Sequence, residues 1–231
     1  MLSVNSVSVR LRKWNRSGGQ WHWALKGIDF HLEVGDRLGV IGRNGSGKST
    51  LCRVLAGILK PTEGAVERQG AVVPLLGFGA ALQPELSGTE NVRLLARLLG
   101  SPMQAIDRIH DEVVEETGLG EWLSEPVSHY STGMRAKLAF IVATSVHADI
   151  LLLDEALGAG DLAFRKRAMR RLQSFMQKAK VLVMVSHQLQ EIRKNCNKVL
   201  WMENGTIRSM GKPEHVLPMY RESMSQAEAR R

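Results

Sequence analysis

The chain has 231 residues, of which 44% are hydrophobic, and a formal net charge of +8. This length and apolar share suit one large domain, or a domain with a subdomain, around a buried core. No apolar run approaches the roughly 20 residues of a membrane-spanning helix, and the N-terminus lacks a signal peptide's apolar stretch, so we expect a cytosolic protein. The positive charge suits nucleic acid, anionic lipid or an acidic ligand such as a nucleotide, and charge alone does not choose among them. Cys52 and Cys196 lack the spacing of a metal or redox motif and are expected to be reduced.

Apolar residues alternate with polar ones near the N-terminus, which predicts strands. A first strand begins with the valines of Val4–Val9, and a second covers Leu25–Val34. In the second strand, Ile28, Phe30 and Leu32 fall on one side, as in an antiparallel strand with one buried face.

A glycine-rich segment from Gly42 to Thr50 reads G-R-N-G-S-G-K-S-T and fits the phosphate-binding pattern G-x-x-x-x-G-K-[S/T]. It follows a short apolar strand, Arg37–Ile41, and opens a predicted helix, Ser49–Ala56, which is the context that such a loop requires. Glycines allow backbone N–H groups to surround a phosphate, and the helix N-terminus adds partial positive charge. Lys48 supplies a full charge for the β- and γ-phosphates, and the Ser49 hydroxyl is a ligand for Mg²⁺. The predicted phosphate-binding residues are Gly42, Arg43, Asn44, Gly45, Ser46, Gly47, Lys48, Ser49 and Thr50.

The pattern changes to helix between residues 88 and 147, where apolar residues recur every three or four positions. One such stripe holds Val92, Leu95, Leu98 and Leu99. We read residues 84–147 as a helical subdomain inserted into an α/β core of residues 1–83 and 148–220. The remaining residues, 221–231, are polar and are expected to fray. Within the core, Asn204-Gly205 is a strong hairpin signal between two apolar segments.

Two apolar strands downstream of the loop end in residues that suit phosphate chemistry. Ile150–Leu153 is followed by Asp154 and Glu155, and Val181–Ser186 is followed by His187. Ligands of an open parallel sheet sit at the carboxyl ends of its strands, where the phosphate loop also emerges. Asp154 would then enter the Mg²⁺ shell, and Glu155 would act as the general base for an attacking water. His187 would orient that water or bind a phosphate oxygen; the alternatives are solvated carboxylates and a structural histidine.

Two further segments have two interpretations each. In Y-S-T-G-M, Ser131 or Thr132 caps an apolar helix, and bare Gly133 leaves its N-terminus open to an anion; an ordinary helix cap explains the segment equally well. A basic run further on is read as a solvated helix face, with contact to anionic lipid or to a partner as the alternative. Its members are Arg165, Lys166, Arg167, Arg170 and Arg171.

Taken in chain order, these motifs resemble the ATP-binding subunit of an ABC transporter over nearly the whole chain. The matching pieces are G-R-N-G-S-G-K-S-T, Y-S-T-G-M, L-L-L-D-E, the loop Gly158–Asp161 and the histidine of V-S-H-Q. The resemblance implies an α/β fold: a P-loop NTPase core with an N-terminal antiparallel β subdomain and an inserted helical subdomain. It implies ATP and Mg²⁺ as ligands and a head-to-tail dimer that encloses two ATP molecules. It also implies a separate transmembrane permease at the cytoplasmic face of the inner membrane, and no nucleic acid.

The resemblance also assigns roles to single residues. Ser131, Thr132 and Gly133 would contact the γ-phosphate bound by the other copy. Trp14 resembles the aromatic residue that stacks on adenine, with Trp21 and Trp23 as rivals.

Two departures from the family pattern qualify these roles. Thr132 and Met134 replace a glycine and the glutamine of the usual L-S-G-G-Q signature. Gln83 resembles the glutamine that senses Mg²⁺ and the transporter, although it sits closer to Leu86 than is usual; a solvent-facing glutamine is the alternative. Asp161 is expected to reach across the interface between the two copies of the dimer.

With these departures, the sequence resembles one branch of the family, which exports bacterial cell-surface polysaccharides such as O-antigen, capsule or teichoic acid. Some members of that branch carry a C-terminal carbohydrate-binding domain, which we do not expect here because the chain ends at Arg231. The alternatives are export of another cargo, such as a drug or lipid, and a soluble ATPase that acts on nucleic acid.

Overall fold

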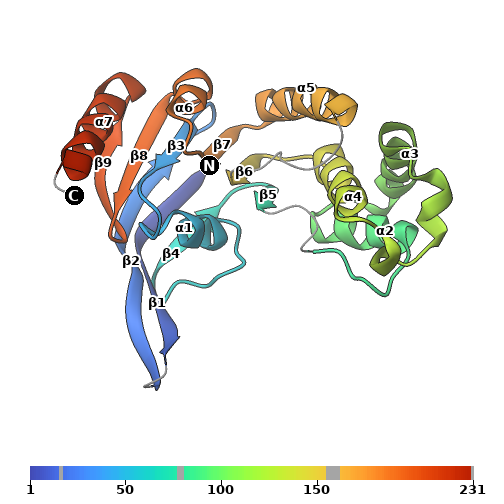
Figure 1. Ribbon diagram of the computed structural model, residues 1–231, viewed down its shortest axis with the longest axis horizontal. Coiled ribbons are helices and arrows are strands. Elements are labelled where there is room, and N and C mark those ends of the chain that lie inside the picture. Colours follow the sequence, from blue (N-terminus) through green and yellow to red (C-terminus); the bar gives the residue numbers. More distant parts are fainter. Residues whose placement is uncertain (16–17, 77–80, 155–161, 230–231) are drawn as a thin grey trace. The chain divides into compact units, whose positions relative to one another are not determined.

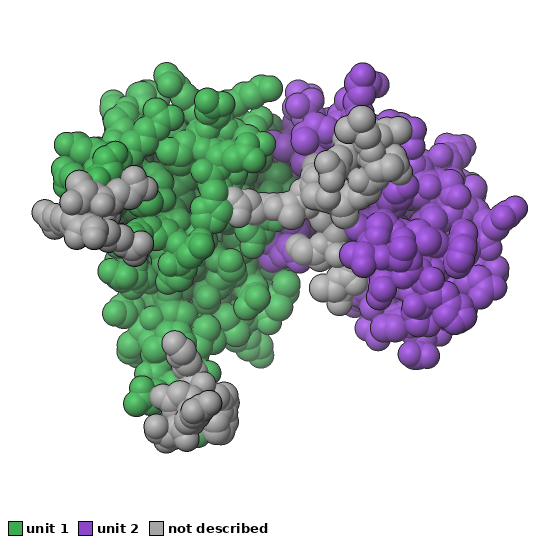
Figure 2. Space-filling view, viewed as in Figure 1, with its two compact units in different colours: residues 1–70, 152–155, 180–231 green, residues 71–151, 156–179 purple. Residues whose placement is uncertain are grey.

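The computed structural model describes residues 1–15, 18–76, 81–154 and 162–229. The chain divides into two compact units, shown in Figure 2. Unit one comprises residues 1–70, 152–155 and 180–231, and unit two comprises residues 71–151 and 156–179. Within the described ranges, no helix is both long and apolar enough to cross a membrane.

Unit one contains a three-stranded antiparallel sheet with the order β2-β1-β4 (Figure 1). Its strands are β1 (Leu2–Asn15), β2 (Gly18–Leu32) and β4 (Glu63–Arg68). The predicted alternation in β2 is confirmed, because Ile28, Phe30 and Leu32 are buried and Asp29 and His31 between them are exposed. β4 accompanies β1 as far as Ser8, whereas β1 and β2 continue side by side as a long ribbon. On this ribbon the guanidinium of Arg10 lies 5.5 Å and 5.7 Å from the ring centroids of Trp21 and Trp23.

A second sheet has the strand order β5-β6-β7-β3-β8-β9. Its strands are β5 (Val72–Leu76), β6 (Ile150–Asp154), β7 (Val181–Val185), β3 (Arg37–Ile41), β8 (Lys198–Glu203) and β9 (Thr206–Gly211). β3 pairs in parallel with both β7 and β8, and every residue of β7 is buried, as expected for a central strand of a parallel sheet. The predicted hairpin joins β8 to β9, and both Asn204 (φ 49°) and Gly205 (φ 80°) have the positive φ of a type I′ turn.

Among its described residues, unit one has three helices: α1 (Lys48–Leu55), α6 (Leu189–Asn195) and α7 (Pro213–Ala229). The expectation of a frayed tail from residue 221 is wrong, because α7 continues through those residues to Ala229. Its first half is anchored by buried Val216 and Leu217 and by an edge-on contact between Tyr220 and Trp201, whose ring centroids lie 5.5 Å apart.

Unit two contains most of the helices. They are α2 (Gly88–Leu98), α3 (Ile106–Thr117), α4 (Thr132–Ser145) and α5 (Leu162–Lys178), with 3₁₀ turns at Met103–Ala105, Gly120–Ser124 and Val127–His129. α2 begins with a reciprocal capping box between Ser87 and Glu90. Val92 and Leu95 are buried as predicted and Leu99 is half-buried, but Leu98 is 68% exposed and does not belong to the buried face. A separate helical subdomain at residues 84–147 stays a prediction.

Candidate phosphate-binding site

The glycine-rich loop joins β3 to α1 in unit one, and two of its glycines have no room for a side chain. A Cβ atom at Gly42 (φ 151°) would lie 2.4 Å from the carbonyl oxygen of Met202, and one at Gly47 (φ 105°) would lie 2.8 Å from that of Ala24. Contacts this short do not occur between a real Cβ and a backbone oxygen. The loop therefore keeps this course only with glycine at both positions, and its backbone stays open to an approaching anion.

The loop holds a buried cation and a buried hydroxyl. The side chain of Lys48 is inside the loop, where its ammonium donates hydrogen bonds to the carbonyl oxygens of Gly42 (2.7 Å) and Arg43 (3.0 Å). The hydroxyl oxygen of Ser46 is buried and has no hydrogen-bond partner within the described part of the chain. Buried polar atoms are nearly always paired, so the Ser46 hydroxyl fits a loop that receives a polar ligand.

A cavity of about 590 Å³ opens beside the loop, entirely within unit one. Its lining brings together Lys48 from the start of α1, Asp154 from the end of β6 and His187 from the segment after β7. Asn44, Gly45, Ser49 and Thr50 of the loop line the same cavity. These three elements were expected to converge because each begins or ends at the carboxyl edge of the same parallel sheet.

Lys48 and Asp154 both act on the thiol of Cys52. Cys52, one turn into α1, has its thiol pKa raised to about 12 by burial and by the negative charge of Asp154, against a smaller lowering by Lys48. Both charges therefore act at the same place. A thiol with this pKa stays protonated at neutral pH, which fits the expectation that Cys52 is reduced.

Residues that could hold Mg²⁺ are present in the cavity. Ser49 supplies a hydroxyl and Asp154 a carboxylate, the hard oxygen donors that this ion prefers. No group of three or more His, Cys, Asp or Glu side chains that could hold a metal occurs among the described residues. Mg²⁺ is commonly held by one or two protein ligands together with phosphate oxygens and water, so the cavity fits this ion better than it fits zinc.

The turn between β8 and β9 supports the phosphate loop. The N–H of Gly205 donates to the carbonyl oxygen of Ser46 (3.0 Å), and the carbonyl oxygen of Gly205 accepts from the N–H of Lys26 in β2 (2.8 Å). Sequence reasoning found this turn but assigned it no part in the site. A turn signal reports local geometry and does not say which distant loop the turn contacts.

Trp23 is the tryptophan that the structure places in the cavity lining, together with Leu11 and His22 of the same ribbon. It is 37% exposed, so one face is accessible. Trp21 is 56% exposed, and the side chain of Trp14 lies outside the described residues, although its backbone pairs with Gly19. Trp14 is the first choice by family resemblance alone. Strand register decides which tryptophan faces the loop, and it depends on bulges in β1 that the sequence does not reveal.

The remaining candidates lie in unit two or outside the described residues. Ser131 caps α4 by accepting a hydrogen bond from the N–H of Met134 (3.2 Å), and Thr132 and Gly133 form the first turn of that helix. A Cβ at Gly133 would meet only the Ser131 hydroxyl, 3.8 Å away, so the turn is open. Glu155 and Asp161 lie outside the described residues.

Gln83 is exposed in unit two, and its backbone is held by a residue that sequence reasoning missed. The buried side chain of Asn91 accepts a hydrogen bond from the N–H of Gln83 (2.7 Å) and donates to its carbonyl oxygen (3.0 Å). The same amide also donates to the carbonyl oxygens of Leu86 and Ser87, each at 3.0 Å. Asn91 therefore fixes the loop that presents Gln83. The sequence signal for this role of Asn91 is an asparagine on the apolar side of an amphipathic helix.

Comparison with known proteins shows which families and solved structures this chain is similar to. The profile of the ABC transporter family matches residues 25–158. The chain is 37% identical over 207 residues to the O-antigen export system ATP-binding protein RfbB of Klebsiella pneumoniae, covering 90% of this chain and 84% of that one. It is 40% identical over 199 residues to the teichoic acids export ATP-binding protein TagH of Enterococcus faecalis, covering 86% of this chain but only 44% of that one. A dimeric ATP-binding cassette solved in a post-hydrolysis state with ADP and Pi superposes with a TM-score of 0.72 at 20% identity, over 92% of this chain and 99% of that one.

Proposed function

This chain belongs to the ABC transporter family, and from that premise we propose that it is the ATP-hydrolysing subunit of an exporter of cell-surface polysaccharide. The observation that carries the cargo is the likeness to two proteins that are both named for export of surface glycans, one for O-antigen and one for teichoic acids. Their similarity to this chain extends over 86–90% of its length. O-antigen is the cargo that we propose first, because the RfbB likeness spans most of both chains.

The phosphate loop of unit one would bind the triphosphate. Backbone N–H groups of the loop and the N-terminus of α1 face the anion, and the Lys48 ammonium exchanges its two carbonyl acceptors for phosphate oxygens. Ser49 and Asp154 would hold Mg²⁺, which supplies positive charge to the phosphate oxygens when bound. Trp23 would offer its exposed face to the adenine ring.

Hydrolysis needs a water held in line with the γ-phosphorus and a group that accepts its proton. Glu155 follows Asp154 directly, so we assign it the general base. His187 lines the same cavity as Lys48 and Asp154, and its imidazole would orient that water or bind a γ-phosphate oxygen. Proton transfer to a positioned base typically contributes about 10²–10⁴-fold to a rate.

We further propose that two copies act together, with a separate membrane subunit as partner. In a head-to-tail dimer, Ser131, Thr132 and Gly133 of one copy would close over the ATP held by the other. The open first turn of α4 suits this contact, because backbone N–H groups at a helix N-terminus bind anions. ATP binding would close the dimer at the cytoplasmic face of the membrane, and hydrolysis would reopen it.

The catalytic assignment is tested by comparing two variants. Glu155→Gln should bind ATP normally and accumulate as an ATP-bound dimer while losing most turnover, which size-exclusion chromatography and phosphate release measure. Lys48→Ala should weaken ATP binding itself. Intact turnover in Glu155→Gln would remove Glu155 as the base, and normal ATP affinity in Lys48→Ala would contradict the loop assignment.

The cargo is tested separately in cells that lack this chain. If it drives polysaccharide export, lipid-linked glycan should accumulate inside the cytoplasmic membrane and return to normal when the chain is restored. Restoration by Lys48→Ala should fail. Unchanged surface glycan, with no internal accumulation, would assign the ATPase to another cargo.

A further inference from the structure

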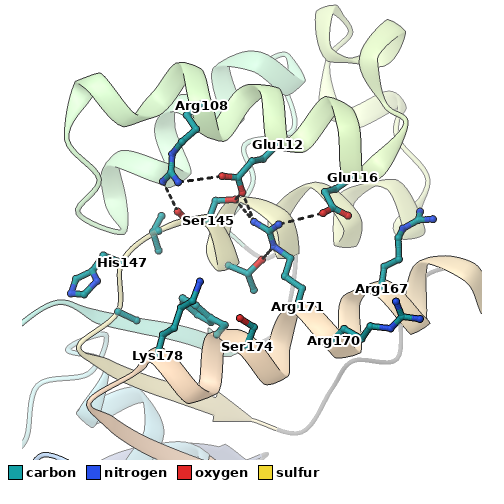
Figure 3. A pocket seen from close by; sticks show the side chains of 14 residues that line it. Arg108, Glu112, Glu116, Ser145, His147, Arg167, Arg170, Arg171, Ser174 and Lys178 are labelled. Atoms are coloured by element: carbon teal, nitrogen blue, oxygen red, sulfur yellow. Dashed lines mark hydrogen bonds and ion pairs between the residues drawn. The ribbon is translucent and has the colours of Figure 1, made fainter.

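Unit two contains a second cavity, of about 640 Å³, that shares no residue with the cavity beside the phosphate loop (Figure 3). It lies between α3, the end of α4 and α5, and its lining carries five cationic side chains against two carboxylates. The cations are Arg108, Arg167, Arg170, Arg171 and Lys178, and the carboxylates are Glu112 and Glu116.

One wall of this cavity is an ordered ionic network around Arg171. The guanidinium donates hydrogen bonds to the hydroxyls of Thr144 (2.7 Å) and Ser145 (2.7 Å) and to the carboxylate of Glu112. Glu116 lies 3.6 Å from the same guanidinium. The side chain of Arg171 is only 21% exposed, so the expectation that the whole basic run is a solvated face is wrong for this residue.

The charge on Glu112 is stabilised in this wall. Burial alone would raise its pKa, but hydrogen bonds from Arg171 and Ser145, with the charges of Arg171 and Arg108, lower the pKa below the ordinary value. Glu112 is therefore ionised and committed to the wall. Its negative charge is already balanced and does not oppose an incoming anion.

Arg108 pairs with Glu112 in the same network (3.5 Å), but the three remaining cations of the cavity are not balanced in this way. Arg167, Arg170 and Lys178 are exposed, and none of them forms an ion pair or a hydrogen bond within the described ranges of the chain. All three line the cavity from α5, along which Figure 3 shows them. Residues 167 and 178 are separated by about 16 Å along a helix that rises 1.5 Å per residue. The cations thus form a row on one rigid element, longer than a single phosphate.

We propose that this cavity binds a phosphate ester through Arg167, Arg170 and Lys178, with the Arg171 network as its fixed wall. The planar guanidinium groups of the two arginines match phosphate oxygens two at a time, and the lysine ammonium adds a point charge. The length of the row favours a diphosphate, or a phosphate attached to a larger polar body. The cavity's volume falls in the range of small-molecule sites, which favours a headgroup or soluble ester over an extended acidic peptide.

Inorganic pyrophosphate is the soluble probe, and the phosphate loop must first be prevented from binding it. All measurements therefore use chains that carry Lys48→Ala. In this background, Arg167→Gln with Arg170→Gln removes two cations from the cavity. The matched control, Arg93→Gln with Lys166→Gln, removes two exposed cations of α2 and α5 that do not line it. Unchanged thermal midpoints show that both pairs fold.

Calorimetry at low ionic strength should detect pyrophosphate binding that weakens about tenfold or more in the cavity pair, because each lost charge-assisted hydrogen bond costs about tenfold in affinity. The control pair should bind within about twofold of the parent. Equal weakening in the two pairs would reduce the effect to net charge and overturn the proposal.

A second arm distinguishes a lipid headgroup from a soluble ester. Vesicles of phosphatidylcholine with and without phosphatidylglycerol are sedimented with the same chains. If the parent and control chains bind the phosphatidylglycerol vesicles and only the cavity pair loses this binding, the proposal is supported and the phosphate ester is a lipid headgroup. Poly-glutamate serves as a polyanion without phosphate. If neither pyrophosphate nor these vesicles bind through the cavity residues, or if poly-glutamate alone binds through them, the site does not recognise phosphate and the proposal fails.

Discussion

Replacement of Gly42 by alanine tests how closely the phosphate loop is held by its surroundings. The new Cβ would lie 2.4 Å from the carbonyl oxygen of Met202 in β8 and 2.6 Å from the Ser46 hydroxyl. The first of these atoms is backbone in a paired strand, so the loop rather than the strand must move, by about 1 Å, to reach an ordinary contact. The positive φ of Gly42 adds about 1–2 kcal/mol, and an overpacked contact typically adds about 1–3 kcal/mol.

Gly45→Ala is the matched control in the same loop. Gly45 also has positive φ (79°), but nothing lies within 4 Å of the position that its Cβ would take. It should therefore lose only the backbone contribution, about 1–2 kcal/mol, whereas Gly42→Ala should lose about 3 kcal/mol of unfolding free energy. Urea denaturation without nucleotide measures both.

Nucleotide then provides a second reading of Gly42→Ala. At a concentration of ATP one hundred times its Kd, the parent chain should gain about 2.7 kcal/mol in unfolding free energy. The displaced loop should gain less than about 1 kcal/mol at the same concentration, because its N–H groups no longer converge on the phosphates. If Gly42→Ala and Gly45→Ala are equally stable, or if Gly42→Ala keeps the full gain from ATP, the steric argument is refuted.

Three further predictions concern charges and the buried thiol. Arg171→Met should lower the unfolding free energy by about 2 kcal/mol, because it leaves Glu112 partly buried without its donor, whereas Arg170→Met should change it by less than about 0.5 kcal/mol in the same urea titration. The loss of unfolding free energy in Arg171→Met should become smaller in acid. Because the pKa of Glu112 in the folded chain lies below its ordinary value, the stabilisation is present above the ordinary pKa and disappears as pH falls through the folded pKa. A loss that does not depend on pH would contradict the ion pair. Cys52, with a pKa of about 12, should resist iodoacetamide at pH 8 until the chain unfolds, and rapid labelling of the folded protein would contradict its burial.

The local parts of the site could be predicted from sequence because they are encoded locally. The course from β3 through the glycine loop into α1 needs only neighbouring residues to specify it. Asp154 and His187 followed from a rule of topology, since residues at the carboxyl ends of parallel strands share an edge. The structure places both beside Lys48 in one cavity.

Long-range contacts set the limit of that reasoning. Arg171 belongs to a run of basic residues that is typical of a solvated helix, and only the packing of α3 against α4 and α5 brings Glu112 to it. The end of α7 was missed for a similar reason. Its second half lacks an apolar period, and the contacts that hold the helix, those of Val216, Leu217 and Tyr220, lie in the first half.

The β8–β9 turn has a consequence for how nucleotide binding is sensed elsewhere in unit one. The N–H of Gly205 donates to the phosphate loop and its carbonyl oxygen accepts from β2, so one chain of hydrogen bonds joins the loop, the turn and the three-stranded sheet. A ligand that holds Ser46 in place also slows the opening of the turn. By thermodynamic reciprocity, a turn that opens more readily lowers the affinity for that ligand. Deuterium uptake at the amide of Gly205, which lines the same cavity, is therefore a gauge of nucleotide occupancy.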